Sequence, residues 1–279
     1  MRDLKFKFLG TGTSSGIPVI GCDCAVCTSA DPKDNRLRTS AAIEWFDDSG
    51  KPRTVLIDTS PDLRQQALRF DIKRLDAILY THNHVDHTFG LDEVRRYNAI
   101  QEQAIDVYAE TSTMTFLKRT FGHIFESEKN VNQSFVASLI GWPLEIGKSI
   151  DLYGVRFTPV RVLHGRLPIA GFRIEPAPGE KRVAADKHSI LPLAYLTDVS
   201  AIPPETWPAL KGVRTLVLDA LRHRHHPTHL TLGQAVSIAH EVGAEHTYFV
   251  HMTHDLGHAE TQRNLPEGMM LAWDGLELK

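Results

Sequence analysis

The chain has 279 residues, a formal net charge of −3, 42% hydrophobic residues and 23% charged residues. A chain of this length and composition can bury a large core without disulfide support. The negative net charge argues against a broad surface for binding nucleic acid. No run approaches the roughly 18–20 consecutive apolar residues that a membrane-spanning helix needs. Residues 4–8 alternate apolar and basic side chains as a strand does, unlike a signal peptide. We therefore expect a cytoplasmic protein without membrane contact.

Strand-like runs rich in Val, Ile, Leu, Phe and Tyr recur along the chain, bounded by Gly, Pro, Asp or Ser. Helical patterns lie at 60–70, where Ser-Pro opens the helix, at 112–125, and at 231–244, between an N-cap at Thr231 and a stop at Gly243. We expect a large α/β protein with two sheets faced by helices. A long surface insertion is expected at 175–192. The strand-like runs are 4–9, 41–46, 53–58, 76–80, 105–109, 155–163, 170–175, 193–197, 214–219, 246–250 and 269–273.

A cysteine cluster follows the first strand-like run. Cys22, Cys24 and Cys27 are the three cysteines of the chain. An odd and closely spaced set is not a disulfide framework, and in a cytosolic protein it is typical of a metal site. The preceding segment GTGTSSG, at 10–16, lacks the Lys-Ser/Thr of a phosphate-binding loop, and we interpret it as a turn beside the site.

The densest polar motif is THNHVDH at 81–87, directly after an apolar run. The ends of strands commonly build the sites of α/β proteins. His82 and His84 would project the same way from an extended loop, and Asp86 and His87 could reach a second ion. Imidazole together with carboxylate suits Zn, Mn or Fe. Two further carboxylates that end apolar runs, Asp58 and Asp219, are interpreted as supporting groups rather than ligands.

The motif His-x-His-x-Asp-His after an apolar strand resembles the signature of the metallo-β-lactamase superfamily. The resemblance implies an α/β fold, the αβ/βα four-layer sandwich of two central sheets flanked by helices, with residues 1–279 as a single domain. It requires a further His, Asp and His at strand ends, and these are His164, Asp198 and His251. Two metal ions are implied, one held by His82, His84, His164 and Asp198, the other by Asp86, His87, Asp198 and His251.

The opening segment with Cys-x-Cys-x-x-Cys resembles the phosphoribosyl 1,2-cyclic phosphate phosphodiesterases of phosphonate (carbon–phosphorus lyase) metabolism. A closed zinc site needs four ligands, so a histidine must join the three thiolates. The resemblance implies His254 as that ligand, with His258 as the alternative, in a structural-zinc loop spanning residues 21–28. It also implies His229 as general acid, and Asp86 is expected to act in catalysis as well as in metal binding.

These resemblances imply a metal-dependent hydrolase, a phosphodiesterase in which a hydroxide between two divalent ions (Zn, Mn or Fe) attacks a small cyclic phosphodiester. One alternative is a transfer-RNA 3′-processing-type nuclease, although the long RNA-gripping arm of those enzymes has no equivalent here. Another is a binding or accessory protein similar to pyrroloquinoline-quinone biosynthesis protein B, against which the intact ligand set argues.

The expected partner is a small phosphorylated substrate rather than nucleic acid, and a homodimer would be common for this superfamily. A basic segment close to His229 could hold a substrate phosphate. Which of its side chains contact substrate is left open: Arg222, His223, Arg224, His225 and His226.

Overall fold

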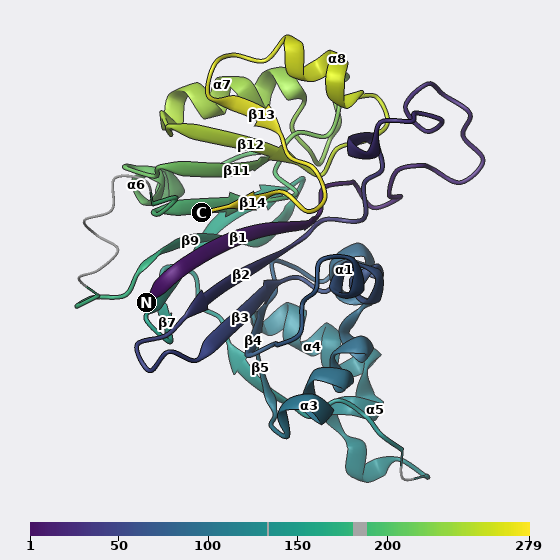
Figure 1. Ribbon diagram of the computed structural model, residues 1–279, viewed down its shortest axis with the longest axis vertical. Helices are drawn as coiled ribbons and strands as arrows, with labels where there is room; N and C mark the ends of the chain where they lie inside the picture. Colours follow the sequence, from purple (N-terminus) through teal and green to yellow (C-terminus); the bar gives the residue numbers. More distant parts are fainter. Residues whose placement is uncertain (133, 181–188) are drawn as a thin grey trace.

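Two seven-stranded β-sheets form the centre of the described part of the protein (Figure 1). A computed structural model describes residues 1–132, 134–180 and 189–279. The strands are β1 Arg2–Gly10, β2 Ser40–Phe46, β3 Pro52–Ile57, β4 Ala77–Leu79, β5 Ile105–Ala109, β6 Leu139–Pro143, β7 Ile150–Leu152, β8 Val155–His164, β9 Leu167–Pro176, β10 Leu193–Leu196, β11 Thr215–Asp219, β12 His246–Val250, β13 Met269–Leu271 and β14 Glu277–Leu278. The helices are α1 Leu63–Arg69, α2 Val85–Thr88, α3 Arg95–Gln101, α4 Thr111–Thr120, α5 Gly122–Phe125, α6 Trp207–Leu210, α7 Leu232–Val242 and α8 His258–Arg263. Short 3₁₀ turns lie at Pro32–Asp34, Leu91–Val94, Ser127–Lys129 and Pro204–Thr206.

Each sheet is mixed and ends in a parallel half. The first sheet has the order β14-β1-β2-β3-β4-β5-β6, in which β3 to β6 are parallel. The second has the order β13-β12-β11-β10-β9-β8-β7, in which β10 to β13 are parallel. The carboxyl ends of parallel strands lie at one edge of a sheet, which is where polar residues can gather into a site.

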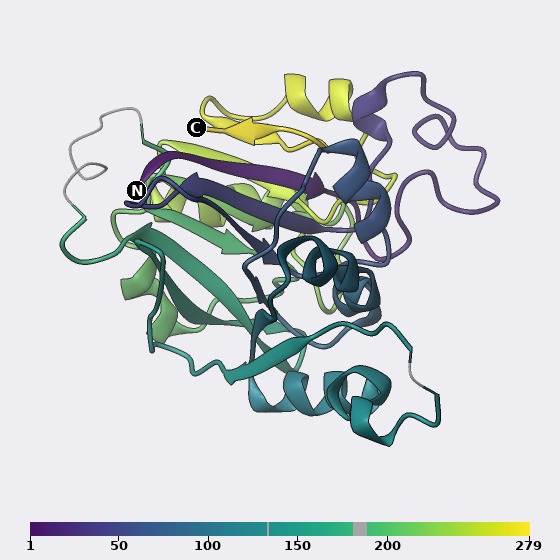
Figure 2. The ribbon, with the colours of Figure 1, turned by 60° about the horizontal axis from the view of Figure 1, so that its bottom comes forward.

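Three apolar clusters hold the layers together and confirm the αβ/βα sandwich. One cluster lies between the two sheets and includes Phe8, Ile57 and Phe172. A second joins the first sheet to α1, α4 and α5, and a third joins the second sheet to α6 and α7. Because neighbouring residues of a strand face opposite sides, Leu56 belongs to the outer cluster while Ile57 belongs to the inner one. Figures 1 and 2 show helices on the outer faces of both sheets.

Each predicted strand run coincides with a strand, and three strands were missed. β6 contains Gly141 and ends on Pro143, residues that are depleted in strands. β7 has three residues and β14 has two, too few for a periodic pattern. All three depend on pairing with their neighbours rather than on their own sequence.

The predicted helices form, with two corrections at their ends. α1 begins at Leu63 rather than at the Ser-Pro pair. The N-cap residue is Asp62, whose side chain accepts hydrogen bonds from Arg38 and makes none to the helix. The pattern at 112–125 is divided at Phe121 into α4 and α5. α7 is as predicted, because Thr231 forms a capping box and Gly243, with φ of 67°, ends the helix.

The middle of the predicted insertion at 175–192, residues 181–188, lies outside the described residues. Among the helices that are described, none combines the length and the hydrophobicity needed to cross a bilayer.

A buried carboxylate holds the loop that follows β1. Asp274 accepts hydrogen bonds from Thr11 Oγ1 at 2.8 Å and from the Leu37 backbone N–H at 2.7 Å. Burial raises the pKa of Asp274 to about 7, although both hydrogen bonds act in the opposite direction. The folded chain therefore keeps this proton at a pH at which the unfolded chain has lost it.

The free energy of unfolding should therefore fall as the pH rises from about 5 to about 8. Asp274 ionises near pH 3.8 in the unfolded chain and near pH 7 in the folded one, so the unfolded state binds fewer protons in this window. Asp274→Asn removes this contribution. In urea titrations at matched metal content, the wild type should lose on the order of 2 kcal/mol more than the variant, since one pKa unit corresponds to about 1.4 kcal/mol. Equal losses in both proteins would contradict this role.

Candidate metal centre

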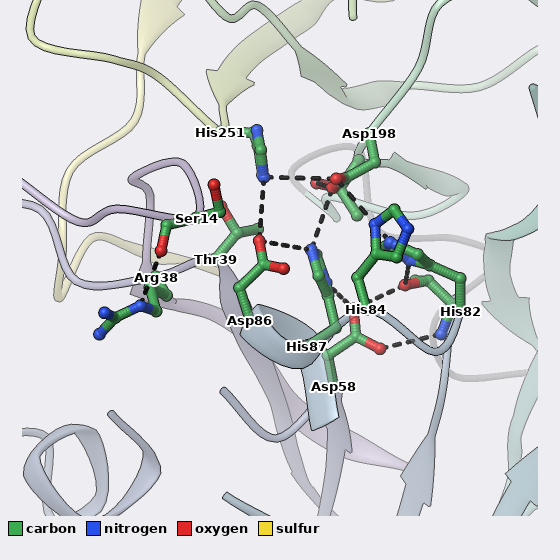
Figure 3. Close-up of polar contacts among 12 residues, drawn as sticks. Ser14, Arg38, Thr39, Asp58, His82, His84, Asp86, His87, Asp198 and His251 are labelled. Carbon is green, nitrogen blue, oxygen red and sulfur yellow. Dashed lines mark hydrogen bonds and ion pairs between the residues drawn. The ribbon is translucent and has the colours of Figure 1, made fainter. Parts of the chain in front are cut away.

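Strand ends bring the predicted site residues together (Figure 3). Asp58 directly follows β3, and His82 lies just beyond β4. In the second sheet His164 ends β8, Asp198 lies just beyond β10, and His251 directly follows β12. The structure thus places these residues where the apolar runs of the sequence predict.

Three of these residues have a left-handed backbone. The φ angle is 62° at Asp58, 58° at Asp198 and 61° at His251. This conformation costs a residue with a Cβ about 1–2 kcal/mol. It persists where the surrounding structure determines it, commonly at functional sites.

The THNHVDH motif ends in the single turn α2. His84 is the N-cap residue with an extended backbone, while Asp86 and His87 lie within the turn. The motif therefore presents its first two histidines from an extended segment and its last two ligand candidates from a helix. Gly90 lets this turn approach the loop after β3, because a Cβ there would lie 2.1 Å from the Ser60 carbonyl oxygen.

Two groups of donor side chains share Asp198. Within each group the candidate ligand atoms all lie within 4.8 Å of one another. Asp198 Oδ2 lies 3.9 Å from His82 Nε2 and 3.3 Å from His251 Nε2. Asp198 Oδ1 lies 3.3 Å from His87 Nε2. The groups are His82, His84, His164 and Asp198, and Asp86, His87, Asp198 and His251.

Buried ring nitrogens show that these residues fit metal ions. The Nε2 atoms of His82, His87 and His251 are buried and have no hydrogen-bond partner. A buried polar atom without a partner is costly, and ligation to a metal ion removes that cost. Imidazole and carboxylate are donors that Zn, Mn and Fe accept. The two groups therefore suit two divalent ions with Asp198 between them.

Hydrogen bonds behind the rings leave Nε2 facing the centre. His87 Nδ1 donates to Asp58 Oδ2 at 2.7 Å. Thr81 Oγ1 donates to the same carboxylate at 2.8 Å and accepts from His82 Nδ1 at 2.9 Å. Such bonds fix ring orientation and tautomer in metal sites. Asp58 is therefore placed as a supporting carboxylate, as its position after a strand suggested.

Burial favours the neutral form of two histidines, while His87 and His251 share charge with the carboxylates. Burial opposes protonation of these two rings as well, but Asp198 and other nearby carboxylates overcome it and raise the pKa of both. Burial lowers the pKa of both His82 and His164, and the His87 ring lowers that of His82 further. Neutral imidazole is the ligating form. Burial opposes ionisation of Asp198, but His251 and His87 overcome it and hold its pKa well below the usual range.

His229 reaches the centre from the loop before α7. Its ring centroid lies 4.6 Å from that of His164 and 4.7 Å from that of His251. The loop is tied to the first donor group, because His164 Nδ1 donates to the Thr228 carbonyl oxygen at 2.8 Å. Asp219, His229 and His251 form a further group of close donors. The predicted general acid is thus beside both donor groups and a member of neither.

The basic segment forms part of the rim, and its residues differ in their surroundings. Arg222 donates to carbonyl oxygens of its own loop, and Arg224 Nη2 lies 3.4 Å from a carboxylate oxygen of Asp255. The His226 ring is 5.3 Å from the His229 ring. All five candidates are at least partly exposed: Arg222, His223, Arg224, His225 and His226.

The three cysteines gather around His254. Nδ1 of His254 lies 3.2 Å from Cys22 Sγ, 3.5 Å from Cys24 Sγ and 3.3 Å from Cys27 Sγ. A tetrahedral zinc with Zn–S of about 2.3 Å and Zn–N of about 2.0 Å separates sulfur from nitrogen by about 3.5 Å. The backbone N–H of Cys27 lowers the pKa of the Cys24 thiol to about 7, which favours the thiolate, whereas burial raises the pKa of the Cys27 thiol to about 11. These residues therefore fit a closed zinc site.

His258, the alternative fourth ligand, lies apart from this cluster. It begins α8, and its backbone N–H donates to Asp34 Oδ1 at 2.8 Å. Its ring packs edge-on against Trp273 with centroids 5.8 Å apart. The structure therefore favours His254 over His258.

Comparison with known proteins identifies the family. Residues 53–252 match the family model described as "Beta-lactamase superfamily domain". The chain belongs to this family. The metallo-β-lactamase superfamily predicted from THNHVDH is confirmed, and its fold implies a hydrolase with divalent metal ions at these strand ends.

Several individual proteins are similar to this chain, three of them over nearly its whole length. A new diphosphatase from the PhnP family has a TM-score of 0.85 at 44% identity, and the alignment covers 99% of this chain and 98% of that one. Zn-bound PqqB from Methylobacterium extorquens, at 18% identity, TM-score 0.75 and 99% coverage of both chains, shows the same fold. An octanoyltransferase from Porphyromonas gingivalis is 37% identical over 276 residues, which are 98% of this chain and 51% of that protein. Coenzyme PQQ synthesis protein B from Acinetobacter baylyi is 28% identical over 63% of this chain and 59% of its own length. The chain thus spans about half to three fifths of these curated relatives.

A buried arginine missed in the sequence ties the segment after the cysteines to the loop that carries His254. Arg36 is 1% exposed, and its guanidinium donates to the carbonyl oxygens of Thr253 and Leu256 and to Asp34 Oδ1. The two carbonyls flank His254, so Arg36 holds that loop beside the cysteines. Arginine is usually exposed, and no local pattern marked this one.

Arg36→Met should lower the free energy of unfolding by about 3–5 kcal/mol, because it removes the buried cation that pairs with Asp34 and the hydrogen bonds that its guanidinium donates to two carbonyl oxygens. Arg38→Met is the matched control. Arg38 pairs with Asp62 at 2.9 Å but is 30% exposed, so its loss should cost less than about 1 kcal/mol. Urea denaturation of both variants at equal metal content measures the difference. Similar losses would contradict the role of Arg36.

Proposed function

We propose that this protein is a metal-dependent phosphodiesterase that hydrolyses a small phosphodiester, with a cyclic phosphate as the preferred class. The observation that carries this proposal is the position of His229, a histidine outside both donor groups but in ring contact with each. Two divalent ions in such a site supply positive charge to a phosphoryl group and acidify water. Hydrolysis of a diester also needs a proton for the departing oxygen, and a histidine suits that task near neutral pH.

Different residues of the chain would orient the donor groups and supply the proton. Asp198 faces both donor groups and orients them about one centre. When the bond from phosphorus to the leaving oxygen breaks, the electron pair stays on oxygen and His229 Nε2 supplies the proton. The free side of the ring is Nε2, because Nδ1 is within 3.1 Å of Asp219 Oδ1. A cyclic diester suits the arrangement, since its ring opens without release of a fragment.

Cleavage of a diphosphate is the second candidate, and the 44% identity to a PhnP-family diphosphatase over 99% of this chain favours it. Both reactions attack phosphorus, and they differ in the leaving group. A phosphate leaves as a weaker base than an alkoxide and depends less on an acid. The ratio of the two activities should therefore depend on His229.

The test uses protein of known metal content, loaded with Mn or Zn, and compares bis(p-nitrophenyl) phosphate with p-nitrophenyl phosphate. Cleavage of the diester with little cleavage of the monoester supports the proposal. A panel of cyclic phosphates and of nucleoside diphosphate esters then separates the two candidates. Metal-loaded protein that cleaves none of these substrates overturns both, and a binding or accessory role would replace them.

A further inference from the structure

Asp219 is a fully buried carboxylate at the end of β11 for which the proposed reaction has no direct use. β11 pairs in parallel with β12, and Asp219 lies opposite Val250. The next residue along β12 is His251, a member of the second donor group. The strand register thus brings Asp219 beside a ligand candidate, while the loop before α7 brings His229 to the same place.

One oxygen of this carboxylate faces two imidazoles. Asp219 Oδ1 lies 3.1 Å from His229 Nδ1 and 3.6 Å from His251 Nδ1. Its other oxygen, Oδ2, accepts the backbone N–H of Leu230 at 3.0 Å. The His251 Nδ1 atom is buried and has no hydrogen-bond partner, and Asp219 Oδ1 is within ion-pair distance of it.

The two rings are also aligned. The planes of His229 and His251 are 14° apart with centroids 4.7 Å apart, so the rings are stacked with both Nδ1 atoms toward the same carboxylate. The opposite edge of His251 carries Nε2, which lies 3.3 Å from Asp198 Oδ2. The Nε2 edge of His229 therefore points in the same direction as the Nε2 edge of His251, which faces the donor groups.

We propose that Asp219 is a positioning residue that holds a metal ligand, His251, and the proton donor, His229, as one unit. The proton-donor part rests on the proposed function. Asp219 accepts a hydrogen bond from the His229 Nδ1–H before and after the reaction, while the Nε2 proton of the doubly protonated ring moves to the leaving oxygen. Because the same carboxylate also contacts His251, a single side chain would set the position of the acid relative to this ligand candidate.

Asp219→Asn tests this without a large change in shape. The Leu230 N–H must keep an oxygen as its acceptor, so the amide NH₂ would face the Nδ1 atoms. His229 Nδ1 can pair with that group only when it carries no proton, and the ring proton then resides on Nε2. A neutral ring that gives up its Nε2 proton becomes an imidazolate, so this tautomer is a poor acid.

The first measurement needs no activity. The ring that acts as the acid carries a proton on both nitrogens, so the tautomer is compared in the neutral ring. Long-range ¹H–¹⁵N spectra of zinc-loaded protein with labelled histidines should show the single proton of the neutral His229 ring on Nδ1 in the wild type and on Nε2 in Asp219→Asn. A neutral wild-type ring whose one proton is on Nε2, or a tautomer unchanged by the substitution, overturns the proposal. Because this result does not depend on turnover, it stands even if no phosphodiester is a substrate and the proposed function fails.

The second measurement uses diesters that differ in leaving group. Asp219→Asn should lower turnover of an alkyl ester about 10- to 100-fold, and that of a p-nitrophenyl ester by a smaller factor, because the p-nitrophenolate ion needs little protonation. The matched control is Asp58→Asn. Asp58 supports His87 through the same kind of bond, at 2.7 Å, and has no bond to His229, so this variant should lower both substrates by one common factor. A common factor for Asp219→Asn as well would overturn its link to the acid.

Discussion

His229→Ala should lower turnover of an alkyl phosphodiester by about 100-fold or more while the metal content stays that of the wild type. The reason is geometric, since the ring is in contact with His164 and His251 but belongs to neither proposed ligand set. The loss should be smaller for a p-nitrophenyl ester or a diphosphate, whose leaving groups are weaker bases. Turnover measured together with metal analysis of the same samples tests both parts.

His240→Ala is the matched control for this prediction. His240 is an exposed residue of α7, the helix that follows the His229 loop. Its replacement removes an imidazole of the same size without reaching the centre, so turnover and metal content should both stay at the wild-type level. If His229→Ala retains full turnover of alkyl esters, the general acid must be another group. If it loses metal instead, His229 is a ligand.

The ligand candidates could be found in the sequence because each is marked locally. Four lie within THNHVDH. The other three, His164, Asp198 and His251, follow or end apolar runs that form β8, β10 and β12 in the structure. The resemblance to a known superfamily then supplied the division into two groups, which spacing alone does not give. His254 needed that resemblance too, because His258 is also a histidine just beyond the same strand.

The supporting structure could not be predicted in the same way. Asp219 was noticed as a carboxylate after a strand, but its contact with two imidazoles depends on the register of β11 and β12 and on the return of the His229 loop. Arg36 and Asp274 act through backbone carbonyl and N–H groups of distant segments. Such contacts have no sequence period, so they appear only when the chain is folded.

The cluster of Cys22, Cys24, Cys27 and His254, the proposed zinc site, offers the second large effect. Cys24→Ser should remove one zinc per chain and lower the free energy of unfolding by several kcal/mol, because zinc binding at a structural site contributes directly to folding. The two halves of the cluster are far apart in sequence, 227 residues between Cys27 and His254, so the ion closes a very long loop. Asp23→Asn is the control, since Asp23 is exposed between the cysteines and should leave metal content and stability unchanged. Metal analysis should give about two ions per chain for Cys24→Ser and about three for the control. Three ions in the serine variant would place the zinc elsewhere, whereas loss of all three would mean that this loop also holds the strand end that carries His251.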